Sequence, residues 1–381
     1  MPFWRVRATR VGRTLAIALL FHPALSRAQE PEASPSPRPI RVCAGGDVTL
    51  GTNLDLKWAR LAESRLRAQY GLSADPATLV APLRSLFHDA DIVLVNVETA
   101  VGSGRVEKPK CSKRSKNCFA FRSDTSAAAA FRSIGDSSAV VIGNVANNHA
   151  RDAGGEGVDA TIAHLTSARV LVTGADTFAT PIVLAGGSTI AVLGFYTSTE
   201  TPDARDLAAV RRHVARAVAM YGTVIVTAHI GAEGATAQRT GDSTEYFLES
   251  RIDRGNPVAF ANAALDAGAT LVIGHGPHVL RAAEWRDDRL VLYSLGNLAT
   301  YGPFNLLEPM NRGVVACADL VDRQVIGAEL RPTMQLGPGV VRPDPSFRAL
   351  TLIDSLGVLD FPTTGARVNA WGELLRPLSP N

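Results

Sequence analysis

The sequence predicts a mixed α/β protein in which two β-sheets face one another. Up to residue 275, apolar runs of strand length alternate with segments of helical period. Later runs pair as hairpins across short polar turns. Polar residues of metal-binding type follow directly on several of the apolar runs, as expected where chemistry lies at the carboxyl ends of strands.

The expected elements alternate along the first two thirds of the chain. Strands are expected at 40–44, 92–95, 140–142, 170–172, 190–193, 224–227 and 271–273, and helices at 54–70, 76–87, 126–131, 158–167, 204–220 and 257–267. Antiparallel pairs are expected between 279–284 and 290–293 and between 314–320 and 325–330. Beyond residue 343 we expect only short helix and coil.

The N-terminus has the features of a secretory signal. Residues 1–28 carry five arginines and no acid, an apolar stretch from Leu15 to Leu25 and a Ser26-Arg27-Ala28 cleavage site. An uncleaved membrane anchor is the alternative, but the stretch is short and contains Pro23. A Pro-rich linker is expected at 29–39, a main domain at 40–335 and a C-terminal extension at 336–381. The expected location is periplasmic or cell-surface.

The charge balance argues against a nucleic-acid partner. The whole chain has 39 basic and 36 acidic residues, a formal net charge of +3. Without the five N-terminal arginines, 34 basic residues face 36 acidic ones and the net charge is −2. No basic excess remains for a phosphate backbone.

Four cysteines can form disulfides in an exported protein. Cys111 and Cys118 flank a short basic loop, where a disulfide is favoured over a zinc knuckle because the spacing is wide. Cys43 and Cys317 lie in apolar, strand-like runs, so buried free thiols are expected there.

Five segments join apolar runs to possible metal ligands: Gly45-Gly46-Asp47, Asn96-Val97-Glu98, Asn147-Asn148-His149, Ala228-His229-Ile230 and Gly274-His275-Gly276-Pro277-His278. Carboxylate, amide and imidazole groups together suit one or two divalent transition metal ions, Mn, Fe or Zn. Each segment alone has a plainer explanation, such as an Asx turn at Asp47 or a core histidine at His229. The shared position at strand ends favours one common site.

These segments resemble, in order and spacing, the bacterial capsule synthesis protein CapA family. The similar segments are Gly46-Asp47-Val48-Thr49-Leu50-Gly51, Asn96-Val97-Glu98, Ala146-Asn147-Asn148-His149-Ala150-Arg151-Asp152-Ala153-Gly154, His229-Ile230-Gly231-Ala232-Glu233, Gly274-His275-Gly276-Pro277-His278-Val279 and Tyr293-Ser294-Leu295-Gly296-Asn297. The family is linked to poly-γ-glutamate capsule production and resembles the calcineurin-like metallophosphoesterases. The resemblance covers about residues 40–300.

The resemblance implies a four-layer αββα metallophosphoesterase-like sandwich with the site at the sheet edges. It implies three groups of site residues: metal ligands at Asp47, Glu98, Asn148, His229, His275 and His278; catalytic groups at His149 and Asp152; and substrate contacts at Asn147, Glu233, Arg122 and Asn297. His149 would be the general acid that assists the leaving group, while water activated at the metal site attacks.

Three departures from the family pattern bear on this site. Thr49 stands where metallophosphoesterases usually have the histidine of Asp-x-His, and Gly276 replaces one histidine of the common Gly-His-His-Pro-His. Ile230 stands in place of the tryptophan of His-Trp-Gly. One metal position is therefore open to question.

Three functions remain open at this stage. The first is an exported metal-dependent hydrolase or transfer enzyme acting on an anionic cell-envelope polymer, with capsule-synthesis membrane proteins as partners. A basic loop from Lys108 to Arg122 would meet that polymer, unless it is only a solvated surface loop. The second is a non-catalytic accessory protein that binds the polymer, and the third is an exported α/β domain without metal.

Overall fold

The computed structural model describes residues 38–51, 56–102, 118–247, 251–302, 304 and 306–377, besides the isolated residues 4, 8 and 9. Apart from these three residues the expected signal segment lies outside the described residues, as do nearly all of the linker, Cys111 and the lysines of the basic loop. The body described below starts at Arg38.

The first sheet has eight strands in the order β18-β17-β16-β1-β2-β5-β6, with β15 also paired to β1. Their bounds are β1 Ile40–Thr49, β2 Ile92–Val97, β5 Val140–Asn144, β6 Val170–Thr173, β15 Asn297–Thr300, β16 Arg312–Val321, β17 Gln324–Leu336 and β18 Val340–Pro343. The strands β1, β2, β5 and β6 are parallel, whereas β16 to β18 are antiparallel to their neighbours. The expected hairpin near Asp322 is confirmed.

The second sheet has six strands in the order β13-β14-β12-β9-β8-β7. Their bounds are β7 Thr180–Val183, β8 Thr189–Tyr196, β9 Thr223–His229, β12 Leu271–His275, β13 Ala283–Arg286 and β14 Arg289–Leu292. The antiparallel pairing of β13 with β14 confirms the second expected hairpin, although residues 279–282 lie outside the strand.

The side-chain alternation along the strands builds the layers. In β1 and β2 the inner side chains Val42, Ala44, Ile92 and Leu94 pack against inner residues of the second sheet such as Ile273. The outer side chains of the first sheet pack under α1 Leu56–Tyr70, α2 Pro76–Val80, the 3₁₀ helix Ala81–Leu86, α3 Ser126–Arg132 and α4 Gly154–Ser167. The outer side chains of the second sheet pack under α5 Leu207–Tyr221 and α6 Pro257–Asp266.

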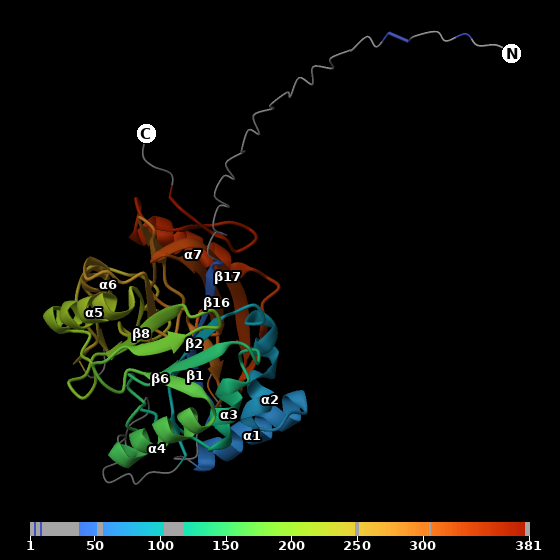
Figure 1. Ribbon diagram of the computed structural model, residues 1–381. Helices are drawn as coiled ribbons and strands as arrows, with labels where there is room; N and C mark the ends of the chain where they lie inside the picture. The colour runs from blue at the N-terminus through green and yellow to red at the C-terminus, as the bar shows by residue number, and fades with distance from the viewer. Residues whose placement is uncertain are drawn as a thin grey trace. The chain divides into compact units, whose positions relative to one another are not determined.

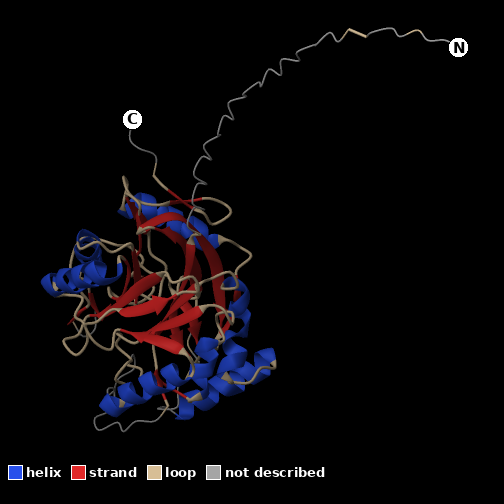
Figure 2. Ribbon diagram, in the orientation of Figure 1, coloured by secondary structure: helices blue, strands red, loops and turns tan. Residues whose placement is uncertain are grey.

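The expected four-layer αββα sandwich is therefore confirmed. Figure 2 shows the strands at the centre and the helices on the outside. Figure 1 shows α5 and α6 beside the second sheet and α1 to α4 along the other side. The expected helix at 76–87 is divided, because Pro82 lies at the start of a 3₁₀ segment.

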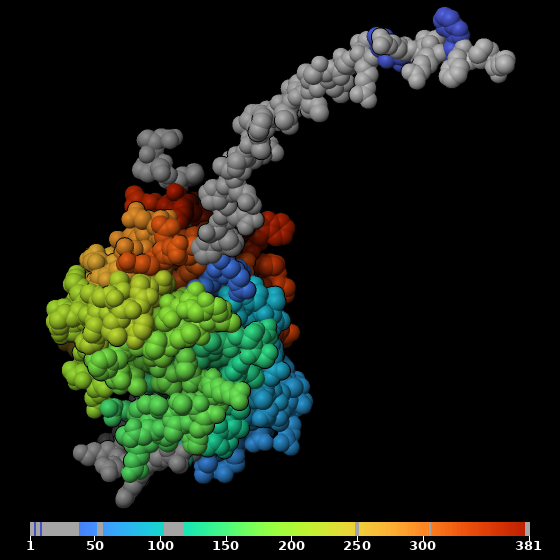
Figure 3. All heavy atoms as spheres, in the orientation of Figure 1, coloured from blue at the N-terminus to red at the C-terminus, as the bar shows by residue number. Residues whose placement is uncertain are grey.

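The C-terminal residues add to both the sheet and the core. β18 forms the edge of the first sheet, and α7 Arg348–Asp360 buries Leu350 and Ile353 in the core between the sheets. Figure 3 shows the red C-terminal residues gathered around the blue start of β1. Of the described residues, none belongs to a helix that is both long and apolar enough to cross a membrane.

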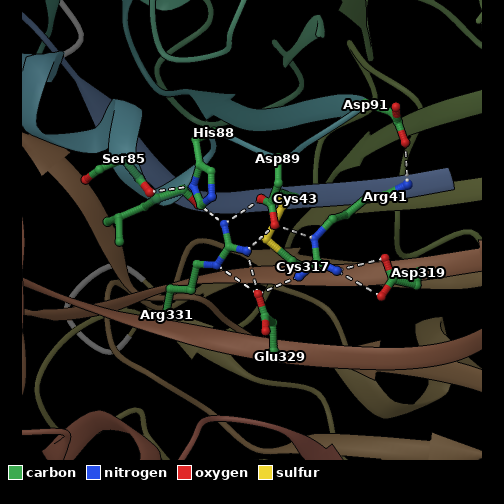
Figure 4. The surroundings of a disulfide bond; sticks show 11 residues. Arg41, Cys43, Ser85, His88, Asp89, Asp91, Cys317, Asp319, Glu329 and Arg331 are labelled. Carbon is green, nitrogen blue, oxygen red and sulfur yellow. Dashed lines mark hydrogen bonds and ion pairs between the residues drawn. A yellow bond between two sulfur atoms is a disulfide. The ribbon is translucent and has the colours of Figure 1, made fainter. Parts of the chain in front are cut away.

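Cys43 and Cys317 form a disulfide, so the expectation of two free thiols is wrong. The two residues face one another across the antiparallel pair of β1 and β16, with their Cα atoms 4.0 Å apart. An apolar run cannot reveal which distant strand lies beside it, and that pairing decides the bond. Figure 4 shows the disulfide beside Arg41 and Arg331, which both contact Asp89.

Cys118 is also disulfide-bonded. Its expected partner, Cys111, lies outside the described residues, so the pairing of Cys111 with Cys118 stays a prediction.

Candidate metal and acid–base site

The five segments come together where strands of the two sheets end. Asp47 and Asn96 are register partners in β1 and β2, and His229 and His275 are register partners in β9 and β12. Asp47 lies inside β1 rather than after it, because the strand continues to Thr49. The two pairs meet because the sheets face one another.

Asp47, Glu98 and His278 form the tightest cluster. One possible ligand atom from each lies within 4.8 Å of the others. The His278 Nδ1 atom is 3.1 Å from Asp47 Oδ2, and its Nε2 atom is 3.6 Å from Glu98 Oε1. Asp47 and Glu98 are almost fully buried, so the carboxylates require a cation or hydrogen-bond donors nearby.

His229 lies against the same two carboxylates. Its Nδ1 and Nε2 atoms are each 3.8 Å from one oxygen, Nδ1 from Asp47 Oδ1 and Nε2 from Glu98 Oε1. His275 is equally buried beside it. Among the residues that the structure describes, His229 Nε2 and both ring nitrogens of His275 have no hydrogen-bond partner.

Burial keeps two of the three imidazoles neutral. Burial lowers the pKa of His229 well below its ordinary value and lowers the pKa of His275 to about 4, although Asp47 opposes both shifts. Burial also disfavours the charged form of His278, but the charges of Glu98 and Asp47 outweigh it and raise the pKa of His278 to about 10. Burial would raise the pKa of Asp47, yet the hydrogen bond and charge of His278 lower it.

These residues fit a divalent metal ion. The set combines two carboxylates with imidazoles, the donor types that Mn, Fe and Zn accept. His229 is already neutral, whereas His278 would have to lose its ring proton to bind the ion. The buried imidazole nitrogens without partners cost free energy unless something binds them. Asp47, Glu98, His229 and His278 would hold the ion, and His275 lies at the same strand end.

Two glycines allow close packing of the backbone and side chains at the site. A Cβ atom on Gly46 would lie 1.8 Å from the carbonyl oxygen of Gly296, so only glycine lets the β1 backbone pass there. Gly276 has a φ of +107°, and its Cβ atom would lie 3.0 Å from the His229 ring. The Gly276 N–H also donates to Asp47 Oδ2 at 3.3 Å. The glycine that replaces a family histidine therefore makes space for His229.

His149 and Asp152 form a buried dyad next to the metal ligands. The His149 Nδ1 atom lies 2.5 Å from Asp152 Oδ2, and its Nε2 atom lies 3.9 Å from Glu98 Oε1. The backbone N–H of Phe121 donates to the same Asp152 oxygen at 2.6 Å. If Nδ1 carries the proton that Asp152 accepts, Nε2 is left to exchange a proton with a bound substrate.

The remaining expected residues separate into different surroundings. Asn297 lies on the site, with its Oδ1 atom 3.1 Å from His278 Nδ1 and its Nδ2 donating to the His278 carbonyl at 3.2 Å. Glu233 lines the pocket beside the site and pairs with Arg254. Arg122 is half-buried in β4 Arg122–Ser123 and is not among the described residues lining that pocket.

Asn147 and Asn148 are not among the described residues that line the pocket beside the metal ligands. Both line a separate hollow that includes Tyr196. The Asn147 amide donates to the Val97 carbonyl at 2.9 Å and accepts the His149 N–H at 3.0 Å. These bonds give Asn147 a positioning role, and its expected substrate contact stays a prediction.

Asn96 is a site residue that the sequence reasoning did not select. Its Nδ2 atom donates to Asp47 Oδ1 at 2.8 Å, and its Oδ1 atom accepts from Asn144 at 3.1 Å and from Asn147 at 3.3 Å. Asn96 therefore orients a metal ligand and ties three strand ends together. Its place in the Asn96-Val97-Glu98 segment was the available signal.

A pocket of about 450 Å³ opens beside these residues. Glu98, His149, His278, Asn297 and Thr49 line its polar side. Thr49, which replaces an expected histidine, donates its hydroxyl to the Glu98 carbonyl at 3.1 Å. A ligand bound in this pocket would therefore contact the site residues directly.

Residues 41–301 match the family model described as bacterial capsule synthesis protein PGA_cap. The chain belongs to this family. Two relatives of this chain, the uncharacterized proteins y4sH and y4uA of Sinorhizobium fredii (strain NBRC 101917 / NGR234), are each 33% identical over 99 residues, 26% of this chain. The match spans 19% of the length of these relatives.

Three solved structures are loosely similar to this chain. TT1561 of Thermus thermophilus has a TM-score of 0.35 and 12% identity, covering 77% of this chain and 98% of its own. GAP50, the anchor in the inner membrane complex of Plasmodium, has a TM-score of 0.36 and 9% identity, covering 83% and 95%. The purple acid phosphatase PPD1 of yellow lupin seeds has a TM-score of 0.36 and 10% identity, covering 80% and 54%.

Proposed function

We propose that this capsule synthesis protein is an exported, metal-dependent hydrolase or transfer enzyme that acts on a phosphoester or amide bond of a cell-envelope polymer or its precursor. One observation carries the proposal. Buried carboxylates and imidazoles meet beside a His149–Asp152 dyad on the wall of an open pocket, and within the described part of the chain His229 Nε2 and both ring nitrogens of His275 have no hydrogen-bond partner.

A divalent ion held by Asp47, Glu98, His229 and His278 would supply Lewis acidity and make water a better nucleophile at neutral pH. Asn96 and Asn297 hold two of these ligands in place through the hydrogen bonds described above. Positioning of this kind commonly changes metal affinity or activity by about 10- to 100-fold.

His149 would protonate the departing oxygen or nitrogen from Nε2. Asp152 supports this role because a carboxylate on Nδ1 fixes the orientation of the ring and stabilises its charged form. The proton on Nε2 is returned from water at the end of the cycle.

Export is supported by the cysteines. The Cys43–Cys317 disulfide and the disulfide-bonded Cys118 suit an oxidising compartment. The signal-like N-terminus agrees with that location.

The proposal is tested by metal analysis together with turnover. We expect the purified protein to hold about one or two equivalents of Mn, Fe or Zn. His149→Ala should lower turnover of bis(4-nitrophenyl) phosphate or a γ-glutamyl amide about 10²- to 10⁴-fold at unchanged metal content. Asp152→Asn should lower it less and should shift the pH profile. His213→Ala on α5, outside the site, is the matched control.

Two outcomes would contradict the proposal. A protein that stays metal-free after reconstitution has no metal-dependent activity. A metal-loaded protein without turnover on either substrate favours the accessory function, a view that the replacement of the expected histidine by Thr49 supports.

A further inference from the structure

The far side of the pocket is apolar, in contrast to its metal-binding side. Six side chains form this apolar wall: Phe119, Phe121, Phe247, Phe304, Leu306 and Met310. Phe119, Phe121 and Phe304 lie with ring centroids 5.2–6.0 Å apart, and Trp58 adds a further ring against Phe304 at 4.5 Å. An apolar cluster of this kind is a ready contact surface for a ligand with an apolar group.

The apolar wall reaches the acid–base dyad directly. The Phe121 ring lies 4.4 Å from the His149 ring, centroid to centroid, and the Phe121 N–H donates to Asp152. An apolar group that packs on this wall therefore lies next to the His149 ring, whose Nε2 atom would protonate the leaving oxygen or nitrogen attached to that group. The wall is also accessible, since 38% of Phe119 is exposed.

Apart from the metal ligands, the described pocket lining offers a polyanion no cationic side chain. Among the described residues that line it there are two carboxylates, Glu98 and Glu233, and neither lysine nor arginine. Arg254 lies near but is already paired with Glu233. Beyond the metal ligands, a chain of glutamate side chains would meet the like charge of Glu233 and would leave the aromatic rings without a partner.

We infer that the substrate is amphiphilic: its phosphoester or amide group binds at the metal ligands, and an apolar group attached to that bond packs on the Phe119–Phe121–Phe304 wall. This inference rests on the proposed function and specifies its substrate class. The apolar group is either aromatic or a prenyl-type aliphatic chain, two sources of the same chemistry.

Calorimetric titration of the metal-loaded protein separates these sources. The probes are 2-naphthylmethylphosphonate, geranylphosphonate, methylphosphonate and tetra-γ-glutamate. We expect one or both apolar phosphonates to bind at least about tenfold more tightly than methylphosphonate, a difference of about 1.4 kcal/mol. The tighter of the two identifies the aromatic or the aliphatic source.

Variants of the apolar wall test whether the tighter binding of the apolar phosphonates comes from contacts in this pocket. Phe119→Ala with Met310→Ala should weaken the apolar phosphonates about tenfold and leave methylphosphonate and metal content unchanged. Phe119→Leu should restore part of the loss, which a misfolded protein would not show. Phe178→Ala, an exposed phenylalanine outside the pocket, is the matched control.

Equal affinity for all three phosphonates, or tighter binding of tetra-γ-glutamate, would overturn the inference. Titration of metal-stripped protein with 2-naphthol and geraniol keeps this result separate from the proposed function. Binding that depends on Phe119 without metal supports the apolar site even where turnover fails. Turnover without any apolar preference keeps the proposed function and removes the inference.

Discussion

Gly276 decides how the imidazoles are arranged. The family commonly has a histidine in its place, but a side chain there would meet the His229 ring and would require a φ of +107°. The next histidine of the family pattern is kept at His278, which has a φ of 59° and lies beside Asp47 and Glu98. The chain therefore loses one family histidine and retains another that contacts both carboxylates.

Gly276→Ala should therefore destabilise the protein and weaken metal binding. We expect the left-handed backbone to cost about 1–2 kcal/mol and the contact with His229 to add about 1–3 kcal/mol to the loss of unfolding free energy. Gly186→Ala is the control, because Gly186 has a φ of +112° and open space around it. Equal losses in urea denaturation would show that the His229 contact is unimportant.

At the scale of elements, β1 links the outer strands of the first sheet to the site. It carries Asp47 toward its end and Cys43 four residues earlier, and the disulfide joins it to β16 across 274 residues of sequence. Arg331 adds a second connection by donating to Asp89 at 2.7 and 2.8 Å. These bonds hold distant parts of the chain beside the metal-binding strand.

Cys43→Ala with Cys317→Ala should lower the unfolding free energy by about 2–5 kcal/mol, because the unfolded chain regains the freedom of a long loop. The measurement is urea denaturation of the oxidised proteins. In strong reductant the wild type should fall to nearly the same stability as the double variant. A difference that persists after reduction would instead point to packing.

The helix α7 should be part of the core rather than an appendage. Leu350→Ala removes a side chain buried between the sheets and should cost about 2–5 kcal/mol of unfolding free energy. Leu359→Ala on the same helix should cost less than about 1 kcal/mol, because 57% of Leu359 is exposed. Similar small losses at both positions would show that α7 contributes little to folding.

At the scale of the whole molecule, carboxylate–arginine pairs make the unfolding free energy depend on pH in the acidic range. The pKa of Asp89 is lowered by its hydrogen bonds from Arg331, and the pKa of Asp354 by those from Arg367. Burial opposes the shift at Asp203, but Arg205 outweighs it and lowers that pKa too. In the unfolded chain these groups return to the ordinary value near 3.8.

The contribution of these pairs to the unfolding free energy should therefore be constant above pH 3.8. It should be lost as the pH drops through the lowered pKa values of the folded protein. Urea denaturation at a series of acidic pH values measures this. Asp89→Asn should flatten the acid-dependent part of the loss. Asp159→Asn, an exposed residue of α4, should not. Parallel pH curves for wild type and Asp89→Asn would contradict the role of this pair.

The sequence by itself determined the layers and the strand-end chemistry. Apolar periodicity is a local property, so runs such as 92–95 and 271–273 can be recognised without knowledge of their neighbours in the fold. Asp47 lies near the end of its strand, and Glu98 and His278 follow theirs closely enough to be selected. Their residue types alone predicted a metal site, since carboxylates and imidazoles bind metal ions wherever the chain brings them together.

Only the tertiary structure decided which residues meet. The pairing of β1 with β16 turns two apparently free cysteines into a disulfide, and the facing of the sheets places His278 between Asp47 and Glu98. The aromatic wall depends on the same cause, because Phe119 and Phe304 are far apart in sequence and adjacent only after folding. Contacts between distant segments depend on packing, which no local pattern records.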